Sequence, residues 1–127
     1  MTLEAGLRAT AEHVVKESHT AIAMGSGDVA VLATPQVLAW CEQATVDSIA
    51  AALAETESAV GMRVRLDHVR ATPVGASVHV EAELSRVEGR RLTFEVRAAD
   101  ARGEIATGQV IRVIVDRDRF LERASSD

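Results

Sequence analysis

One long amphipathic helix, predicted from Thr34 to about Leu53, precedes a second half of the chain in which short strands alternate with turns. At about 100° per residue, small and apolar side chains gather on one side of this helix, opposite Gln36, Gln43 and Asp47. The side chains on or beside the apolar centre are Val37, Leu38, Cys41, Thr45, Ser48, Ile49 and Ala52. A helix with a single apolar side needs one covering layer, which the following strands can supply as a sheet.

Alternation of apolar and polar residues indicates the strands of that layer. The predicted strands are a weak one at residues 5–15 and clearer ones at residues 62–68, 77–87, 91–99 and about 104–116. Glu88-Gly89 and the run from Asp100 to Gly103 are typical of tight turns, so three of these strands are joined as hairpins. The residues between Met24 and Asp28 read as a flexible loop, and a short helix is possible from Asp116 to Arg123. The pattern predicts one α+β domain over residues 1–127, with an antiparallel sheet of about five strands covering the helix.

Composition limits the partners of such a domain. Hydrophobic residues make up 47% of the chain, but Ala and Val dominate, with two Phe and one Trp, so a thin core stabilised by a second chain is expected. The net charge of −5 argues against nucleic acid, and no run approaches the length of a membrane span. Nothing resembles a signal peptide, and the one cysteine, Cys41, reads as a packed residue without a disulfide partner, so the cytoplasm is the expected location.

Glu42 is the first candidate for chemistry. It falls about 80° from the centre of the apolar side of the helix, where a carboxylate loses hydration and becomes suited to proton transfer. The alternative is a border glutamate that reaches solvent or pairs with an arginine.

His68 is the second candidate, because strand alternation turns it toward the helix together with Met62, Val64 and Leu66. An inward imidazole can act as a general base or orient a hydroxyl or water. The alternative is a core histidine held by one hydrogen bond. Glu42 and His68 point into the same layer from opposite sides, which favours the functional interpretation of both.

Three further residues are candidates for the same site as Glu42 and His68. Thr34, followed by proline, reads as the N-cap of the helix, where a hydroxyl lies beside free backbone N–H groups. Gly61 precedes the inward strand and permits close approach of a carbonyl to its N–H, although an ordinary bulge glycine is the alternative. Arg112 shares a strand face with apolar residues and is expected to reach inward unless a bulge turns it.

Other signals are weaker. Arg86, Arg90 and Arg91 form a small basic cluster near a hairpin, which is more typical of a solvated strand end than of a phosphate site. The remaining histidines lack metal-ligand spacing with one another or with Cys41, and no phosphate loop, zinc motif or serine–histidine–aspartate pattern is present in the sequence.

The chain resembles the hotdog-fold acyl-CoA thioesterases, and within them the branch that includes the fluoroacetyl-CoA thioesterase. The resemblance runs from about residue 5 to residue 118 and is densest in four segments. These are Thr34 to Glu42, Gly61-Met-Arg-Val-Arg-Leu-Asp-His68, Ala71-Thr-Pro-Val-Gly75 and Val87-Glu-Gly-Arg-Arg-Leu92. In that branch a threonine opens the central helix, a glutamate follows eight residues later, and a histidine lies seven residues beyond a glycine. Thr34, Glu42, Gly61 and His68 match this order and spacing, and Arg112 matches an arginine near the end of the last strand.

The resemblance implies a hotdog fold and hydrolysis of an acyl-CoA, or a related acyl thioester, to the acid and thiol. Thr34 would be the nucleophile or a positioning hydroxyl, His68 the base, and Glu42 the carboxylate that activates water or attacks the thioester. Gly61 would donate its N–H to the oxyanion, and Arg112 would gate or anchor the site. Coenzyme A would enter only as part of the substrate, with no other cofactor and no metal. The implied assembly is a homodimer or a dimer of dimers.

The chain departs from this branch in one place. An aromatic lid precedes the central helix of the fluoroacetyl-specific enzyme, whereas Gly25-Ser-Gly-Asp28 contains no aromatic residue, so selection of a fluorinated substrate is not expected. Two other functions stay open on the same fold: a non-catalytic module that binds acyl-CoA, and a hydratase or dehydratase acting on an enoyl thioester. Asp67 beside His68 would suit the hydratase, but alternation turns Asp67 outward. The acyl chain, the thiol carrier and the choice of Thr34 or Glu42 as the attacking group are not decided by the sequence.

Overall fold

The computed structural model describes residues 2–126. Within these residues, five strands, three α-helices and two short 3₁₀ turns follow one another. In order they are β1 (Arg8–Val14), η1 (Glu17–His19), α1 (Ala21–Met24), α2 (Thr34–Ile49), η2 (Ala50–Ala52), β2 (Glu57–His68), β3 (Ser77–Glu88), β4 (Arg91–Asp100), β5 (Gly103–Asp116) and α3 (Arg117–Ser125). The single long helix α2 and the two hairpins that join β3, β4 and β5 confirm the predicted α+β class.

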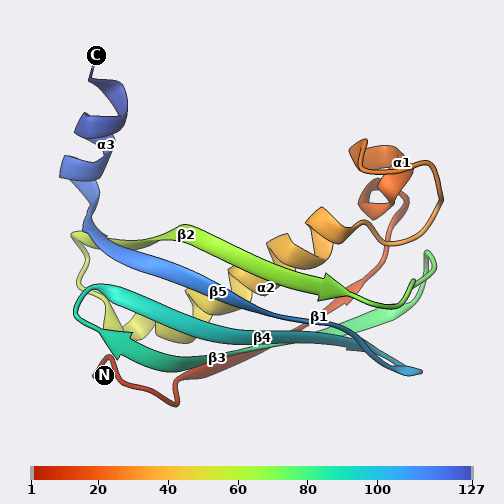
Figure 1. The fold of residues 1–127 in the computed structure, drawn as a ribbon, viewed down its shortest axis with the longest axis horizontal. Coiled ribbons are helices and arrows are strands. Elements are labelled where there is room, and N and C mark those ends of the chain that lie inside the picture. Colours follow the sequence, from red (N-terminus) through yellow and green to blue (C-terminus); the bar gives the residue numbers. More distant parts are fainter. Residues whose placement is uncertain (1, 127) are drawn as a thin grey trace.

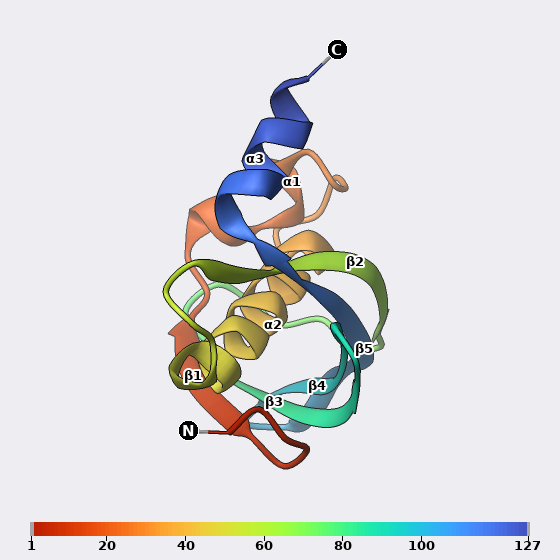
Figure 2. The same ribbon diagram turned by 90° about the vertical axis from the view of Figure 1, so that its left-hand side faces the viewer.

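The sheet is antiparallel, with strand order β1-β3-β4-β5-β2, and it curves around α2 (Figures 1 and 2). This is the predicted hotdog architecture. The end-on view in Figure 2 shows α2 inside the curve of the sheet, while α1 and α3 lie outside that curve. The first and last strands of the order, β1 and β2, are the edges of the sheet.

The core lies between α2 and the concave face of the sheet. Alternate residues of β3 and β4 point into it and are at most 3% exposed: Val78, Val80, Ala82, Leu84, Leu92, Phe94, Val96 and Ala98. These are the inward residues that alternation predicts for the two strands. The buried side of α2 includes the predicted Val37, Cys41 and Thr45 and adds Trp40 and Ala44. Cys41 is buried, which confirms it as a packed residue, and this burial raises the pKa of its thiol to about 12, with a further contribution from nearby Glu42.

Strand β2 differs from its prediction. It begins at Glu57 rather than Met62, so Gly61 lies inside the strand instead of before it. Its pairing with β5 shifts between Gly61 and Arg63, which leaves Met62 in a bulge and 48% exposed, not inward as alternation alone implied. Beyond the bulge, Leu66 and His68 face the helix as predicted.

The loop that follows His68 is held by a buried carboxylate at the end of β4. The Asp100 side chain is 4% exposed and accepts hydrogen bonds from the Thr72 hydroxyl and the Arg102 N–H, each at 2.9 Å. Burial alone would raise the pKa of Asp100, but these two bonds and the guanidinium groups of Arg102 and Arg70 outweigh it and hold the pKa below its ordinary value. These contacts tie the loop after β2 to the end of β4. None of the helices within residues 2–126 has the length and apolarity required to cross a membrane.

Candidate active site

Thr34 and His68 meet where the N-terminus of α2 approaches the end of β2. The Thr34 hydroxyl oxygen lies 2.7 Å from His68 Nδ1, a normal hydrogen-bond distance. The two residues are 34 positions apart in sequence, so the fold creates this contact. A hydroxyl bonded to an imidazole is an arrangement in which the imidazole can accept the hydroxyl proton.

The structure corrects the predicted cap of α2. Ala33 occupies the N-cap position, no side chain caps the helix there, and Thr34 is its first residue, followed by Pro35. The Thr34 hydroxyl therefore bonds to His68 instead of a backbone N–H of its own helix. It still lies at the positive end of the α2 dipole, where a developing anion is stabilised.

Burial favours the neutral form of His68. Desolvation lowers the pKa of its imidazole, and the backbone of Arg70 opposes this only in part. The second ring nitrogen, Nε2, is buried and has no hydrogen-bond partner among the described residues. A neutral imidazole beside a hydroxyl is in the protonation state that a general base requires.

Thr34 and His68 line an open pocket of about 360 Å³. The other walls come from α1 and the loop after it, from the residues before α2, and from the start of the loop after β2. They include Ala21, Val29, Val31, Leu32, Ala33 and Val69. These side chains are apolar, and Asp28 and Arg70 add charge to the lining. Val69 is 71% exposed, so the pocket is not closed by its own chain.

A second cluster forms around Glu42 in the middle of α2. The Glu42 carboxylate lies 3.9 Å from Arg112 Nη1, and its Oε2 is 3.1 Å from the point a Cβ on Gly61 would occupy. Gly61 and Arg112 are directly paired across β2 and β5, so both face the helix at this level. Any side chain at position 61 would press on the carboxylate, which explains why glycine suits this position.

Arg112 faces inward as predicted and is 7% exposed. Its Nε and Nη1 atoms are buried and lack hydrogen-bond partners within residues 2–126. Burial lowers the pKa of Arg112, and the Glu42 carboxylate opposes this. Buried donors without acceptors are costly, so this guanidinium is suited to bind an oxygen of a ligand.

The two clusters are separate within one chain. His68 follows Gly61 by seven positions along β2, a rise of about 23 Å, and Glu42 follows Thr34 by eight positions along α2, a rise of about 12 Å. In the part of the chain that the structure describes, no hydrogen bond joins the Thr34–His68 cluster to the cluster around Glu42. The expectation that Glu42 and His68 converge is therefore not met inside a single protomer.

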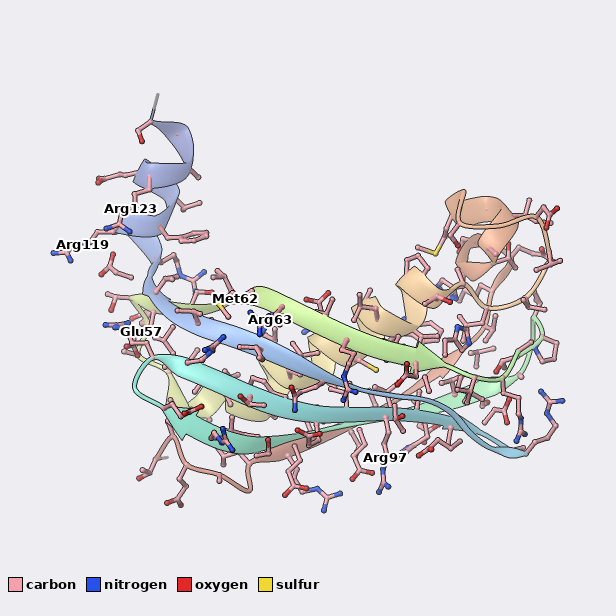
Figure 3. All side chains as sticks on the ribbon, in the orientation of Figure 1. Glu57, Met62, Arg63, Arg97, Arg119 and Arg123 are labelled. Carbon is pink, nitrogen blue, oxygen red and sulfur yellow. The ribbon has the colours of Figure 1, made fainter. Side chains whose placement is uncertain are left out.

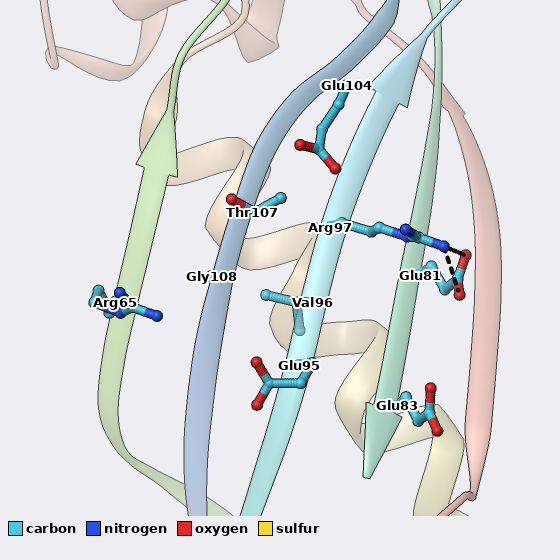
Figure 4. Close-up of a pocket in the computed structure, with 9 residues that line it drawn as sticks. All are labelled: Arg65, Glu81, Glu83, Glu95, Val96, Arg97, Glu104, Thr107 and Gly108. Atoms are coloured by element: carbon cyan, nitrogen blue, oxygen red, sulfur yellow. Dashed lines mark hydrogen bonds and ion pairs between the residues drawn. The ribbon is translucent and has the colours of Figure 1, made fainter. Parts of the chain in front are cut away.

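A larger groove of about 460 Å³ lies on the convex face of the sheet (Figure 4). Its walls carry four glutamates and two arginines, some of which are paired. Arg97 lies 3.5 Å from Glu81, and the Gln109 amide donates to Glu95 at 3.1 Å. None of the five predicted site residues lines it. This groove is a solvated polar face, away from the Thr34–His68 pair.

The sequence and the structure are similar to known thioesterases. Residues 15–118 match the model of the family described as FlK, fluoroacetyl-CoA-specific thioesterase. A fluoroacetyl-CoA thioesterase from Streptantibioticus cattleyicolor is 38% identical over 90 residues, which cover 71% of this chain and 65% of that relative's length. A solved structure of the fluoroacetyl-CoA thioesterase FlK superposes with a TM-score of 0.91 at 30% identity, covering 100% of both chains. A hot-dog-like protein from Thermanaerovibrio acidaminovorans gives a TM-score of 0.87 at 26% identity, covering 94% of this chain and 89% of the other.

Proposed function

Because this chain belongs to the fluoroacetyl-CoA-specific thioesterase family, we propose that it hydrolyses acyl thioesters of coenzyme A to the free acid and the thiol. The observation that carries the proposal is the 2.7 Å contact between the Thr34 hydroxyl and a largely neutral His68 in an open pocket. A module that only binds acyl-CoA would have no use for a base beside a hydroxyl. Asp67, which a hydratase could use, is paired with Thr107 on the convex face and cannot assist.

The active unit that we propose is a homodimer joined through β2. This strand is a sheet edge of 12 residues that exposes Met62 and Val64 by 48% and 43%, which is an unprotected edge of the kind that pairs with another chain. The other edge, β1, is shorter, with seven residues; both edges carry charged side chains, so length and exposed apolar residues are what distinguish β2. In a two-fold dimer the two β2 strands run antiparallel, so the Gly61 region of one strand lies near the His68 end of the other.

Such pairing supports a composite site. Thr34 and His68 of one protomer would face Glu42, Gly61 and Arg112 of the other across the dimer axis. His68 would accept the proton of Thr34 or of a water, and the Gly61 N–H and the unpaired donors of Arg112 would stabilise the thioester oxyanion. Glu42 would orient or deprotonate the attacking water.

Complementation between two inactive chains tests the composite site. In a heterodimer of His68→Ala and Glu42→Gln protomers, one site keeps Thr34 and His68 from the second chain and Glu42 from the first, and is therefore intact. We expect about half of the wild-type kcat per dimer from the purified heterodimer, while each variant homodimer is inactive. A heterodimer as inactive as its parents would show that each site is built within one protomer.

Release of free thiol from a panel of acyl-CoA substrates tests the activity itself. The panel should include acetyl-, fluoroacetyl-, propionyl- and longer acyl-CoA, with the matching acyl-pantetheines. Because Gly25–Asp28 has no aromatic side chain, we expect turnover without a strong preference for fluoroacetyl over acetyl. Tight binding of these esters with no thiol release above background would instead support the binding module.

The pH dependence of kcat/KM should report the lowered pKa of His68. The base acts in its neutral form, so activity is lost as pH falls and the imidazole becomes protonated. Since burial lowers that pKa, the acid limb should have its inflection below the ordinary histidine value of about 6.5. An inflection above that value, or an acid limb unchanged in a variant without His68, would contradict the assignment.

A further inference from the structure

Helix α3 has little contact with the rest of its own chain. Its root is fixed, because the Arg117 N–H bonds to the Thr56 carbonyl at 2.9 Å and the Arg117 guanidinium bonds to the Glu57 carbonyl at 3.0 Å. Beyond this root the helix stands away from the sheet, with Arg119 and Arg123 projecting from it (Figure 3). Phe120 and Leu121 are 41% and 58% exposed, and none of its residues is buried. Phe120 borders a shallow groove with Arg90 and Val113 of its own chain, but among the described residues neither Phe120 nor Leu121 is buried.

The Thr34–His68 pocket and the adjoining helix α1 have a matching excess of exposed apolar side chains. Val29 and Val69, which line the pocket, are 55% and 71% exposed, and Ile22 and Met24 of α1 are 56% and 40% exposed. Large apolar side chains grouped around a pocket mouth indicate a surface that another element covers. The pocket cannot be covered by its own α3, because α3 follows the end of β5 that pairs with Glu57, at the opposite end of β2 from His68.

The exposed side of α3 and the region of α1 and the Thr34–His68 pocket lie at opposite ends of β2, the free edge of the sheet. Figures 1 and 2 show α1 and α3 rising on the same side of the sheet, beyond β2, with α3 near the start of the strand and α1 near its end. A two-fold axis through the middle of β2 exchanges these ends. The second copy therefore brings its α3 to the α1 side of the first, and the shapes are complementary without any change of fold.

The net charges of α3 and of the segment that contains α1 are opposite in sign, which agrees with contact between the two in a dimer. The segment from Glu17 to Val29 contains the acidic Glu17 and Asp28 and no Lys or Arg, so its net charge is −2. Helix α3 carries three arginines against Asp118 and Glu122, a net charge of +1. Opposite charge on the two surfaces favours the contact between copies and disfavours α3–α3 contacts.

We infer that α3 of each protomer packs against α1 and the 25–31 loop of its partner and closes the partner's Thr34–His68 pocket, with Phe120 as the apolar cover. This inference rests on the proposed function and the β2 dimer, and it adds a residue from a third part of the chain to the site. Covering the pocket would exclude water around the bound acyl group and strengthen the electrostatic contacts inside. Phe120 would then influence which acyl groups fit.

Cross-linking between engineered cysteines tests the placement without using activity. Leu121→Cys and Ile22→Cys replace exposed side chains, so both are expected to fold, and buried Cys41 does not compete. A short bis-maleimide should convert most of the double variant into covalent dimer at low protein concentration. The matched control pairs Leu121→Cys with Arg97→Cys on the convex face, and it should remain monomeric in a denaturing gel (Figure 3). Equal cross-linking of both pairs, or none in the first, would overturn the inference whether or not the protein is a thioesterase.

Substitution of Phe120 gives an independent readout. We expect Phe120→Ala to lower kcat/KM for short acyl-CoA about tenfold, as expected for loss of an apolar contact, with Arg97→Ala unchanged. A heterodimer of Phe120→Ala and His68→Ala chains would contain one site with both native residues, so its kcat/KM should recover to about half of wild type. If the heterodimer keeps the low value of Phe120→Ala, the helix acts on its own protomer and the inference is wrong.

Discussion

A His68→Ala variant should hydrolyse acyl-CoA about 10³-fold more slowly than the wild-type protein, with KM changed far less than kcat. The reason is that His68 is the group in contact with the Thr34 hydroxyl, and loss of a positioned general base lowers rates by roughly 10²–10⁴-fold. Steady-state thiol release at saturating substrate measures the effect.

The chain provides a matched control for this variant. His79 lies on β3, its side chain is 45% exposed, and it pairs with Glu12 outside the pocket, so His79→Ala should keep wild-type kcat. Circular dichroism and thermal unfolding should show both variants folded. If His68→Ala retains kcat within about tenfold of wild type, His68 is not the base.

The largest expected effect on stability is that of Gly108→Ala. A Cβ at this position would lie 2.0 Å from the Arg65 carbonyl oxygen and 2.9 Å from the Leu66 Cα, both backbone atoms of the adjacent strand β2. A backbone atom cannot turn away as a flexible side chain can, so β2 and β5 must move apart. We expect a loss of about 3 kcal/mol in the free energy of unfolding and a fall in Tm of about 10 °C.

The neighbouring position controls for a general effect of changing β5. Gln109 points to the convex face, where its amide bonds to Glu95, so Gln109→Ala should shift Tm by no more than about 2 °C. Gly108 is paired with Leu66, two residues before His68, and moving β2 there should also lower activity. A Gly108→Ala protein with wild-type Tm would mean that the strands are not held this closely.

Local periodicity was sufficient to predict most of the elements. The helix from Thr34 ends its regular part at Ile49 and continues as a 3₁₀ turn to Ala52, close to the predicted end at Leu53. The hairpin strands agree with prediction to within one residue at each end, since their inward residues alternate from Val78 to Leu84 and from Leu92 to Ala98. The 3₁₀ turn at Glu17–His19 and the short helix Ala21–Met24 were not predicted, because each is too short to show an apolar period.

The pairing of site residues depends on contacts that have no sequence signal. A Thr-Pro pair is typical of an N-cap followed by the first helical residue, yet here Ala33 caps α2 and Thr34 bonds to His68. Whether such a threonine caps its own helix or bonds to another element depends on which side chain the fold brings next to it. The bulge at Met62 and the close approach at Gly108 likewise come from strand pairing. The sequence shows a glycine at position 108, but it does not show how closely the backbone of β2 approaches that glycine.

The sequence by itself determined the class of fold, the inward faces of the strands and the set of unusual polar residues, because these follow from periods of two and 3.6 residues along a single chain. Only the tertiary structure decided how those residues group. It places His68 with Thr34, and Glu42 with Gly61 and Arg112, as two clusters at different positions along the free edge strand β2. The physical reason is that the distance between side chains on different elements is fixed by strand register, bulges and edges, which depend on long-range pairing and not on local pattern.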